Sequence, residues 1–84
     1  MADARADLID ALAKQIGVPP LTPPEVEAVL LLAAAAAHGT GDRTSAPLVS
    51  FLAGITAAAS TDRETTLEDI RRRVAELAPE AQTG

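Results

Sequence analysis

Apolar side chains recur at spacings of three and four residues in several stretches of the chain. This spacing places them on one face of an α-helix, which completes a turn every 3.6 residues. The three clearest stripes are Leu8, Ile9, Leu12 and Ile16 within residues 3–16; Leu48, Phe51, Leu52, Ile55 and Ala59 within 45–60; and Leu67, Ile70, Val74 and Leu77 within 66–78. No segment alternates apolar and polar residues with the period of two that a half-buried strand requires. The pattern therefore predicts helices and no strands.

A fourth helix is predicted over residues 23–38, and its apolar residues are not confined to one face. It begins with Thr22-Pro23-Pro24-Glu25, which has the form of a capping box, with a threonine N-cap and a glutamate three residues later. Beyond the first turn it carries valines, three consecutive leucines and five consecutive alanines. A helix that is apolar all round is buried, so we expect this one at the centre of the fold or against a partner.

Helix-breaking residues separate the four predicted helices. Gly17 and the pair Pro19-Pro20 follow the first helix, two glycines follow His38, and Pro79 ends the last helix. Thr65 and Thr66 both offer a cap for the fourth helix. We therefore predict one all-α domain over residues 1–84, a small four-helix bundle with helices near 3–16, 23–38, 45–60 and 66–78 and a frayed tail over 80–84.

We expect the core to form where the apolar stripes meet. The predicted core residues are Leu12, Val29, Leu30, Phe51, Leu52, Ile55, Ile70, Val74 and Leu77. A fully buried Phe51 would make Phe51→Ala cost about 3–5 kcal/mol. Gly54 stands inside a predicted helix, where glycine costs about 1 kcal/mol relative to alanine. A close helix crossing at Gly54, Ala53 and Ala57 would offset that cost.

The composition adds an expectation of self-association. Of the 84 residues 48% are hydrophobic, but 19 are alanine and only 21 are larger apolar residues. A core of that size is marginal for a chain this short, whereas alanine-rich helices can approach one another closely. We therefore expect a homodimer formed through the helix over 23–38, with Leu31 and Leu32 as interaction residues and the helix over 45–60 as a second candidate surface.

The charge balance argues against a nucleic-acid partner. The 12 acidic residues outnumber the 7 basic ones and the formal net charge is −5, whereas neutralising phosphates requires a surplus of positive charge. The only basic run is Arg71, Arg72 and Arg73. Its predicted partners at helical spacing are Glu68, Asp69 and Glu76. We interpret the run as a self-paired, solvated face, with an anionic partner surface as the alternative.

Three absences in the sequence narrow the possible classes of protein further. The chain has no cysteine, which excludes disulfides, thiolate metal sites and thiol catalysis. The uncharged apolar stretch over residues 28–37 is about half as long as a helix that spans a bilayer. The charged beginning of the chain does not have the form of a secretion signal. We expect a cytoplasmic protein without a membrane partner.

No catalytic or metal-binding pattern is visible in the sequence. His38 is the only histidine, and its place in the last turn of a helix favours a capping role, with a role in the following loop as the alternative. That loop contains Asp42 and Arg43 and looks like a phosphate-binding loop, but it lacks the preceding strand and the lysine. We therefore expect no enzymatic activity, no cofactor and no metal.

Ser45 raises an alternative function. Acyl-carrier proteins are also small, acidic and four-helical, and they carry phosphopantetheine on a serine that directly follows an aspartate and starts a helix. Here two residues separate Asp42 from Ser45, and Ala46-Pro47 follows the serine. The carrier motif is thus broken, and an acyl-carrier-like protein modified at Ser45 is the second hypothesis.

Three short segments carry a resemblance to a known family: Ala36-Ala37-His38-Gly39, Ser45-Ala46-Pro47-Leu48 and Phe51-Leu52-Ala53-Gly54. With the amphipathic helix before them, they resemble a small uncharacterised bacterial helical domain family over roughly residues 7–60. Members of that family occur alone or fused to molybdenum-cofactor guanylyltransferase, the enzyme that attaches GMP to molybdopterin. The resemblance implies an accessory domain without its own activity, with His38 and Ala46-Pro47-Leu48 in the common core. We predict a non-enzymatic protein-interaction or regulatory module with such a guanylyltransferase as partner.

Overall fold

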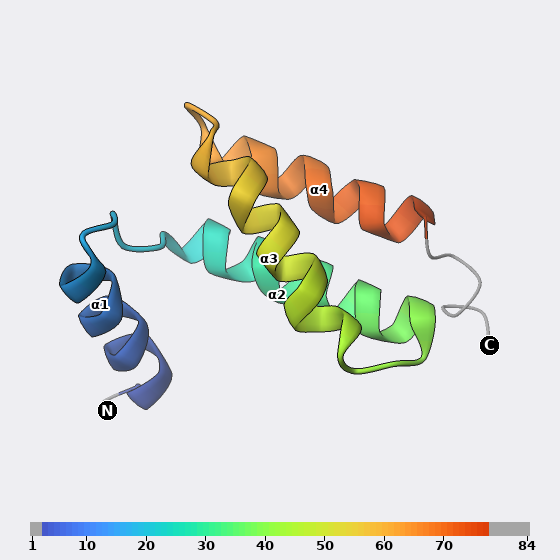
Figure 1. Ribbon diagram of the computed structural model, residues 1–84, viewed down its shortest axis with the longest axis horizontal. Helices are drawn as coiled ribbons and strands as arrows, with labels where there is room; N and C mark the ends of the chain where they lie inside the picture. Colours follow the sequence, from blue (N-terminus) through green and yellow to red (C-terminus); the bar gives the residue numbers. More distant parts are fainter. Residues whose placement is uncertain (1–2, 78–84) are drawn as a thin grey trace.

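The computed structural model describes residues 3–77, which form four α-helices (Figure 1). The helices are α1 (Ala4–Ile16), α2 (Pro23–Thr40), α3 (Ser45–Ala58) and α4 (Arg63–Leu77). No strand occurs in this part of the chain, and the predicted all-α class with four helices is confirmed. The predicted stop at Pro79 and the tail over 80–84 lie outside the described residues.

The end of α1 and the start of α2 follow the predicted signals. Asp3 caps α1, where its carboxylate accepts hydrogen bonds from the backbone N–H groups of Arg5 and Ala6 at 3.0 and 3.3 Å. Gly17 ends α1 in the left-handed region at φ 77°, a conformation that costs glycine little. Both halves of the capping box between Thr22 and Glu25 are present at the start of α2. These local signals acted as predicted because each depends on only a few neighbouring residues.

Two helix ends differ from the prediction. The α2 helix continues past His38 to Thr40, whose Oγ1 donates to the Ala36 carbonyl at 2.9 Å, and only Gly41 adopts the left-handed conformation that ends it. The α4 helix begins at Arg63 because Asp62, rather than a threonine, acts as its cap. The Asp62 carboxylate accepts from the Thr65 backbone N–H at 3.1 Å and from the Thr65 hydroxyl at 2.7 Å.

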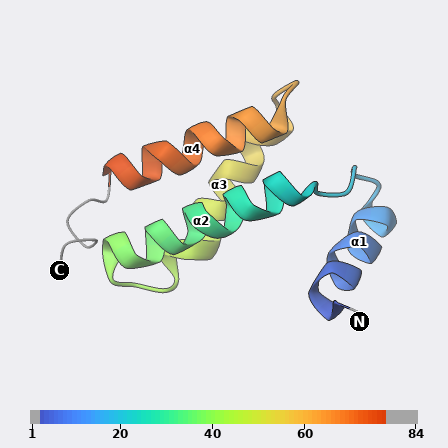
Figure 2. The ribbon, with the colours of Figure 1, turned by 180° about the vertical axis from the view of Figure 1, so that it is seen from behind.

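Helices α2, α3 and α4 pack against one another and enclose the core (Figure 2). The buried cluster consists of Ala28, Leu32, Ala53, Ala57 and Leu67, with Val29, Val49, Ile70 and Val74 partly buried against it. Three of the five buried residues are alanines, so the helix backbones approach closely and little large side-chain volume separates them. Helix α2 is therefore central on the side that carries Ala28 and Leu32, but it is not buried all round, because Leu30 and Leu31 are exposed.

Helix α1 stands apart from the other three. It packs against none of them, and Figures 1 and 2 both show it projecting from the end of the linker that precedes α2. The Cα radius of gyration is 13.5 Å, whereas a compact chain of this length has about 12 Å. The fold therefore consists of a three-helix core and one helix, α1, that lies outside it.

The predicted core was right for three residues and wrong for six. Val29, Ile70 and Val74 pack against the buried cluster as expected. The side chains that the structure leaves exposed instead are Leu12, Leu30, Phe51, Leu52, Ile55 and Leu77. The period of a stripe identifies a helix but not which of its two faces points inward. In α3 the small residues face the core, because alanines permit a closer helix crossing than leucines do.

The expected close helix crossing is found at Ala53 and Ala57 but not at Gly54. A Cβ atom added at Gly54 would meet no other atom within 4 Å, so nothing in the packing requires glycine there. The crossing involves Ala53 and Ala57, which are both buried in the core. The cost of glycine inside this helix has no compensation in the packing.

Candidate functional site

The outer face of α3 is the largest exposed apolar feature of a single helix. Leu48, Phe51, Leu52 and Ile55 are 66%, 69%, 64% and 54% exposed, and α3 contains no charged residue. We call these four residues the α3 outer face. Their spacing of three and four residues brings them together on one side of the helix, opposite Ala53 and Ala57. Contiguous exposed apolar surface of this kind marks interaction sites in soluble proteins.

A second exposed apolar stripe lies on α1. It consists of Leu8, Leu12 and Ile16, one helical turn apart, and all three side chains are exposed. We call these residues the α1 stripe. At 100° per residue, the charged Asp7, Asp10 and Lys14 fall on the other side of the helix. One side of the helix is therefore apolar from Leu8 to Ile16, with Arg5 one turn before Leu8 on the same side, and the other side is charged.

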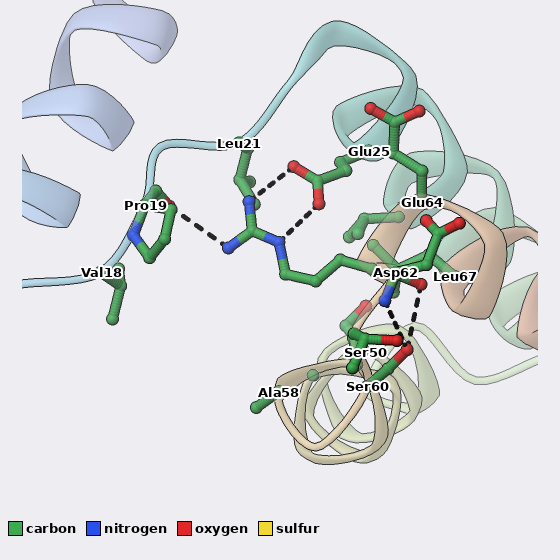
Figure 3. A pocket seen from close by; sticks show the side chains of 15 residues that line it. Val18, Pro19, Leu21, Glu25, Ser50, Ala58, Ser60, Asp62, Glu64 and Leu67 are labelled. Atoms are coloured by element: carbon green, nitrogen blue, oxygen red, sulfur yellow. Dashed lines mark hydrogen bonds and ion pairs between the residues drawn. The ribbon is translucent and has the colours of Figure 1, made fainter.

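A groove separates the linker before α2 from α3 (Figure 3). It has a volume of about 820 Å³ and opens to solvent. Its apolar walls include Val18, Pro19 and Leu21 of the linker and Val29, Gly54, Ala57 and Leu67 of the helices. Its polar end is formed by the beginning of α4 and by Glu25. The groove thus lies next to the three-helix core and along the segment that carries α1.

The polar end of the groove contains a buried ion pair between Glu25 and Arg63. Glu25 is only 2% exposed, and its carboxylate accepts from Arg63 Nε at 2.6 Å and from Arg63 Nη2 at 2.8 Å. The Thr22 backbone N–H also donates to this carboxylate at 2.7 Å. The hydrogen bonds from Arg63 lower the pKa of Glu25, burial opposes that effect, and the bond from Thr22 adds to it. Glu25 is therefore charged in its buried position.

The same guanidinium holds the linker. Arg63 Nη2 donates to the Pro20 carbonyl at 3.0 Å, and Nη1 donates to the Pro19 carbonyl at 3.4 Å. At the same junction the Thr22 hydroxyl donates to Glu64 at 2.9 Å. Among the described residues, no buried side-chain nitrogen or oxygen lacks a hydrogen-bond partner. The ion pair is therefore a structural clamp that joins the linker, α2 and α4.

Sequence reasoning missed this clamp. Glu25 was identified only as part of a local capping box, and Arg63 was not singled out. The two residues are 38 positions apart in the sequence, and no periodic or motif signal connects them. Only the packing of α4 against α2 brings the charges together.

The loop candidates do not converge into a site. The Asp42 carboxylate accepts from the backbone N–H and the hydroxyl of Thr44 at 2.9 and 2.7 Å, and these hydrogen bonds lower the pKa of Asp42. The Ser45 hydroxyl lies 2.7 Å from that of Thr40. Within residues 3–77, no group of three or more histidine, aspartate or glutamate side chains is placed to hold a metal ion. The hydrogen bonds organise the turn between α2 and α3.

Two of the loop candidates remain outside that hydrogen-bond network. His38 is exposed in the last turn of α2, and Arg43 is exposed in the loop that follows. Neither side chain forms a hydrogen bond or an ion pair with another residue in the described part of the chain. At this end of α2 the side-chain hydrogen bond to a helix carbonyl comes from Thr40, which donates to Ala36.

The arginine run is paired along its own helix. Arg71 pairs with Glu68, Arg72 with Asp69 at 3.4 Å, and Arg73 with Asp69 at 2.8 Å. These hydrogen bonds lower the pKa of Glu68 and of Asp69 and raise that of Arg71 and of Arg73. Two of the three expected acidic partners are thus in place, since no ion pair within the described chain involves Glu76.

The two leucines proposed as interaction residues lie in different environments. Leu32 is 0% exposed at the centre of the buried cluster, so its assignment to an interface was wrong. Leu31 is exposed beside Leu30 on the side of α2 that faces away from the core. Consecutive residues on a helix point about 100° apart, which separates a core position from a surface position. An interaction through Leu31 stays a prediction.

Comparison with known proteins identifies a family but not an activity. No curated protein and no solved structure matches the chain. Among the described residues, no helix combines the length and apolar character needed to cross a membrane. One family model, described as a domain of unknown function (DUF6457), matches residues 2–84. The chain thus belongs to this family of small domains whose function is unknown.

Proposed function

We propose that the chain is a non-enzymatic protein-interaction module and that the α3 outer face is its docking surface. The observation that carries this proposal is the exposure of four large apolar side chains on an uncharged helix. Each side chain of this size contributes about 1.5–3 kcal/mol when it is fully removed from water. Phe51 is the only aromatic residue of the chain, and aromatic side chains often dominate the binding energy of interfaces.

The partner that we propose is a molybdenum-cofactor guanylyltransferase. This part of the proposal rests on the resemblance of residues 7–60 to domains that occur alone or fused to that enzyme. A domain found in both arrangements acts as an accessory or regulatory unit, because fusion replaces an association that separate chains must form by binding. The module supplies a docking surface, and the enzyme supplies the chemistry.

A binding titration with two matched variants tests the proposal. The purified chain is titrated into a molybdenum-cofactor guanylyltransferase encoded in the same genome, and the dissociation constant is measured by calorimetry. Phe51→Asp is expected to weaken binding at least about tenfold, because it places a carboxylate in an apolar interface. Leu30→Asp is the control, since Leu30 is also exposed but lies on α2. Equal losses for both variants would contradict the assignment to α3.

Affinity purification followed by mass spectrometry separates the class of function from the named partner. Recovery of the guanylyltransferase supports both parts of the proposal. Recovery of a translation, lipid-synthesis or DNA-bound complex instead, with loss of that complex for Phe51→Asp, would exclude the molybdenum assignment and support the interaction module. Absence of binding to the purified enzyme would also exclude that assignment.

One observation keeps the acyl-carrier hypothesis as a second candidate. Ser45 is the first residue of α3, and carrier proteins hold their modified serine at the start of a helix. Incubation with a phosphopantetheinyl transferase and coenzyme A is expected to increase the mass of the chain under this hypothesis. Ser45→Ala is the control, because it removes the acceptor hydroxyl. An unchanged mass would exclude the carrier function.

A further inference from the structure

We infer that the α1 stripe of one copy docks on the α3 outer face of a second copy, and that two chains exchange their α1 helices in this way. The inference rests on the same exposed face as the proposed function. It adds that a second copy covers this face until a partner displaces it. Leu8, Leu12 and Ile16 would then lie against Leu48, Phe51, Leu52 and Ile55, two stripes that the single chain leaves exposed.

The two surfaces match in length and in charge. Helix α1 has 13 residues and α3 has 14, so each is about 20 Å long. Helix α3 has no charged residue, and Asp7, Asp10 and Lys14 of α1 lie away from its stripe. Arg5 lies at the N-terminal end of the stripe, where its long side chain can keep the guanidinium in water while α1 is docked. The α1 stripe has a spacing of four residues and the α3 outer face has spacings of three and four, and rows of both kinds let two helices interlock.

The exposed area of the chain is in the range that a dimer requires. A compact monomer of 8.6 kDa exposes about 4,700 Å², whereas this chain exposes 6040 Å². A stable protein interface of standard size covers about 800 Å² of each partner. The difference exceeds what such an interface needs. Of the twelve large apolar side chains that are exposed within residues 3–77, seven lie on α1 and α3.

The linker favours a second copy over the same chain as the acceptor of α1. Arg63 binds the Pro19 and Pro20 carbonyls, and the two prolines restrict the backbone dihedral φ of the linker. Folding α1 back onto its own α3 would require the linker to change direction and lose these hydrogen bonds. A second copy can accept α1 in the position that Figure 1 shows. Two such contacts related by a twofold axis form a closed dimer.

Sedimentation equilibrium of the full chain between about 10 and 100 µM tests the inference. The parent chain is expected to be a dimer. Leu12→Asp on α1 and Phe51→Asp on α3 are each expected to raise the dimer dissociation constant at least about tenfold, because each places a carboxylate in the interface. Leu30→Asp, on the outer side of α2, is the matched control and is expected to leave the constant unchanged. Circular dichroism checks that every variant remains helical.

Mixing the Leu12→Asp and Phe51→Asp variants tests whether α1 is the segment that covers the α3 outer face. In a mixed dimer, the unchanged α1 of the Phe51→Asp chain meets the unchanged α3 of the Leu12→Asp chain, so one interface is intact. The mixture is therefore expected to form a dimer at least about tenfold tighter than either variant alone. Direct pairing of two α3 helices predicts instead that Leu12→Asp dimerises like the parent.

Three outcomes would overturn the inference: a parent chain that is monomeric at 100 µM, a Leu12→Asp variant that dimerises as tightly as the parent, and a mixture that remains monomeric. A monomer whose α1 closes on its own α3 falls under the first outcome. Different outcomes would contradict the proposed function. A dimer that does not bind the guanylyltransferase supports the exchange and contradicts that partner, whereas a monomer that binds the enzyme does the reverse.

Discussion

Helices α1 and α4 have similar amphipathic sequences but opposite positions in the fold. Each carries an apolar stripe and several charged residues, and each has a capping aspartate at its start. The α4 stripe packs against α2 and α3, where Leu67 is buried, whereas the α1 stripe meets no other helix. An amphipathic stripe therefore predicts that one face will be buried, but it does not say what will bury it.

The difference between the two helices begins at their connections. A tight turn joins α3 to α4, in which the Ser60 hydroxyl accepts from the Asp62 backbone N–H at 3.0 Å. After that turn, α4 runs back alongside α2 and α3 and packs against them. Helix α1 is instead joined by a linker with two prolines, held by Arg63 in a direction that leads away from the core. The connection thus determines whether an apolar stripe is buried by other helices of the same chain.

The largest expected effect is the difference in stability loss between substitution of a leucine in α4 and of a leucine in α1. Leu67→Ala in α4 is expected to lower the free energy of unfolding by about 2–5 kcal/mol, because it leaves a cavity in the core. Leu12→Ala in α1 is expected to cost less than about 1 kcal/mol at concentrations where the chain is monomeric, since its side chain is exposed. Urea denaturation measures both, and equal losses would mean that α1 packs within its own chain.

The second effect concerns the clamp that directs the linker. Arg63→Ala leaves the Glu25 carboxylate buried without its partner and is expected to cost about 2 kcal/mol, at the low end for a buried pair because Arg63 is partly exposed. It also frees the linker, so the dimer is expected to dissociate more readily. Arg73→Ala, which removes an exposed ion pair, is the control and should leave the urea midpoint unchanged. Similar midpoints for both variants would contradict the structural role of the clamp.

The smallest effect is the pH dependence of the same clamp. The pKa of Glu25 is lowered from its ordinary 4.5 in the folded chain, so this residue stabilises the fold above about pH 4.5. The stabilisation is lost as the pH falls through the lower, folded pKa. Glu25→Gln is expected to cost about 1 kcal/mol at pH 7. Unfolding curves from pH 7 to 3 should show that difference shrinking, and a constant difference would refute the charged role of Glu25.

The fold was predictable to the extent that its signals are local. Gly17 and the capping box at Thr22 acted as the sequence indicated, because each involves only a few consecutive residues. For the candidate site, the sequence predicted only that its apolar residues lie on one side of a helix. Leu48, Phe51, Leu52 and Ile55 were recognised as one face of a helix, but that face was assigned to the core and lies in solvent.

The sequence by itself determined four helices, most of their ends and the grouping of apolar residues into stripes, since these depend on backbone preferences and on the helical period. Only the tertiary structure decided which stripe faces inward. Small alanines on one side of α3 let its backbone approach α2, and that gain in close packing outweighs the exposure of the leucines and Phe51 opposite. Tertiary structure alone also joined Glu25 to Arg63, because a contact between residues 38 positions apart exists only after the helices have packed.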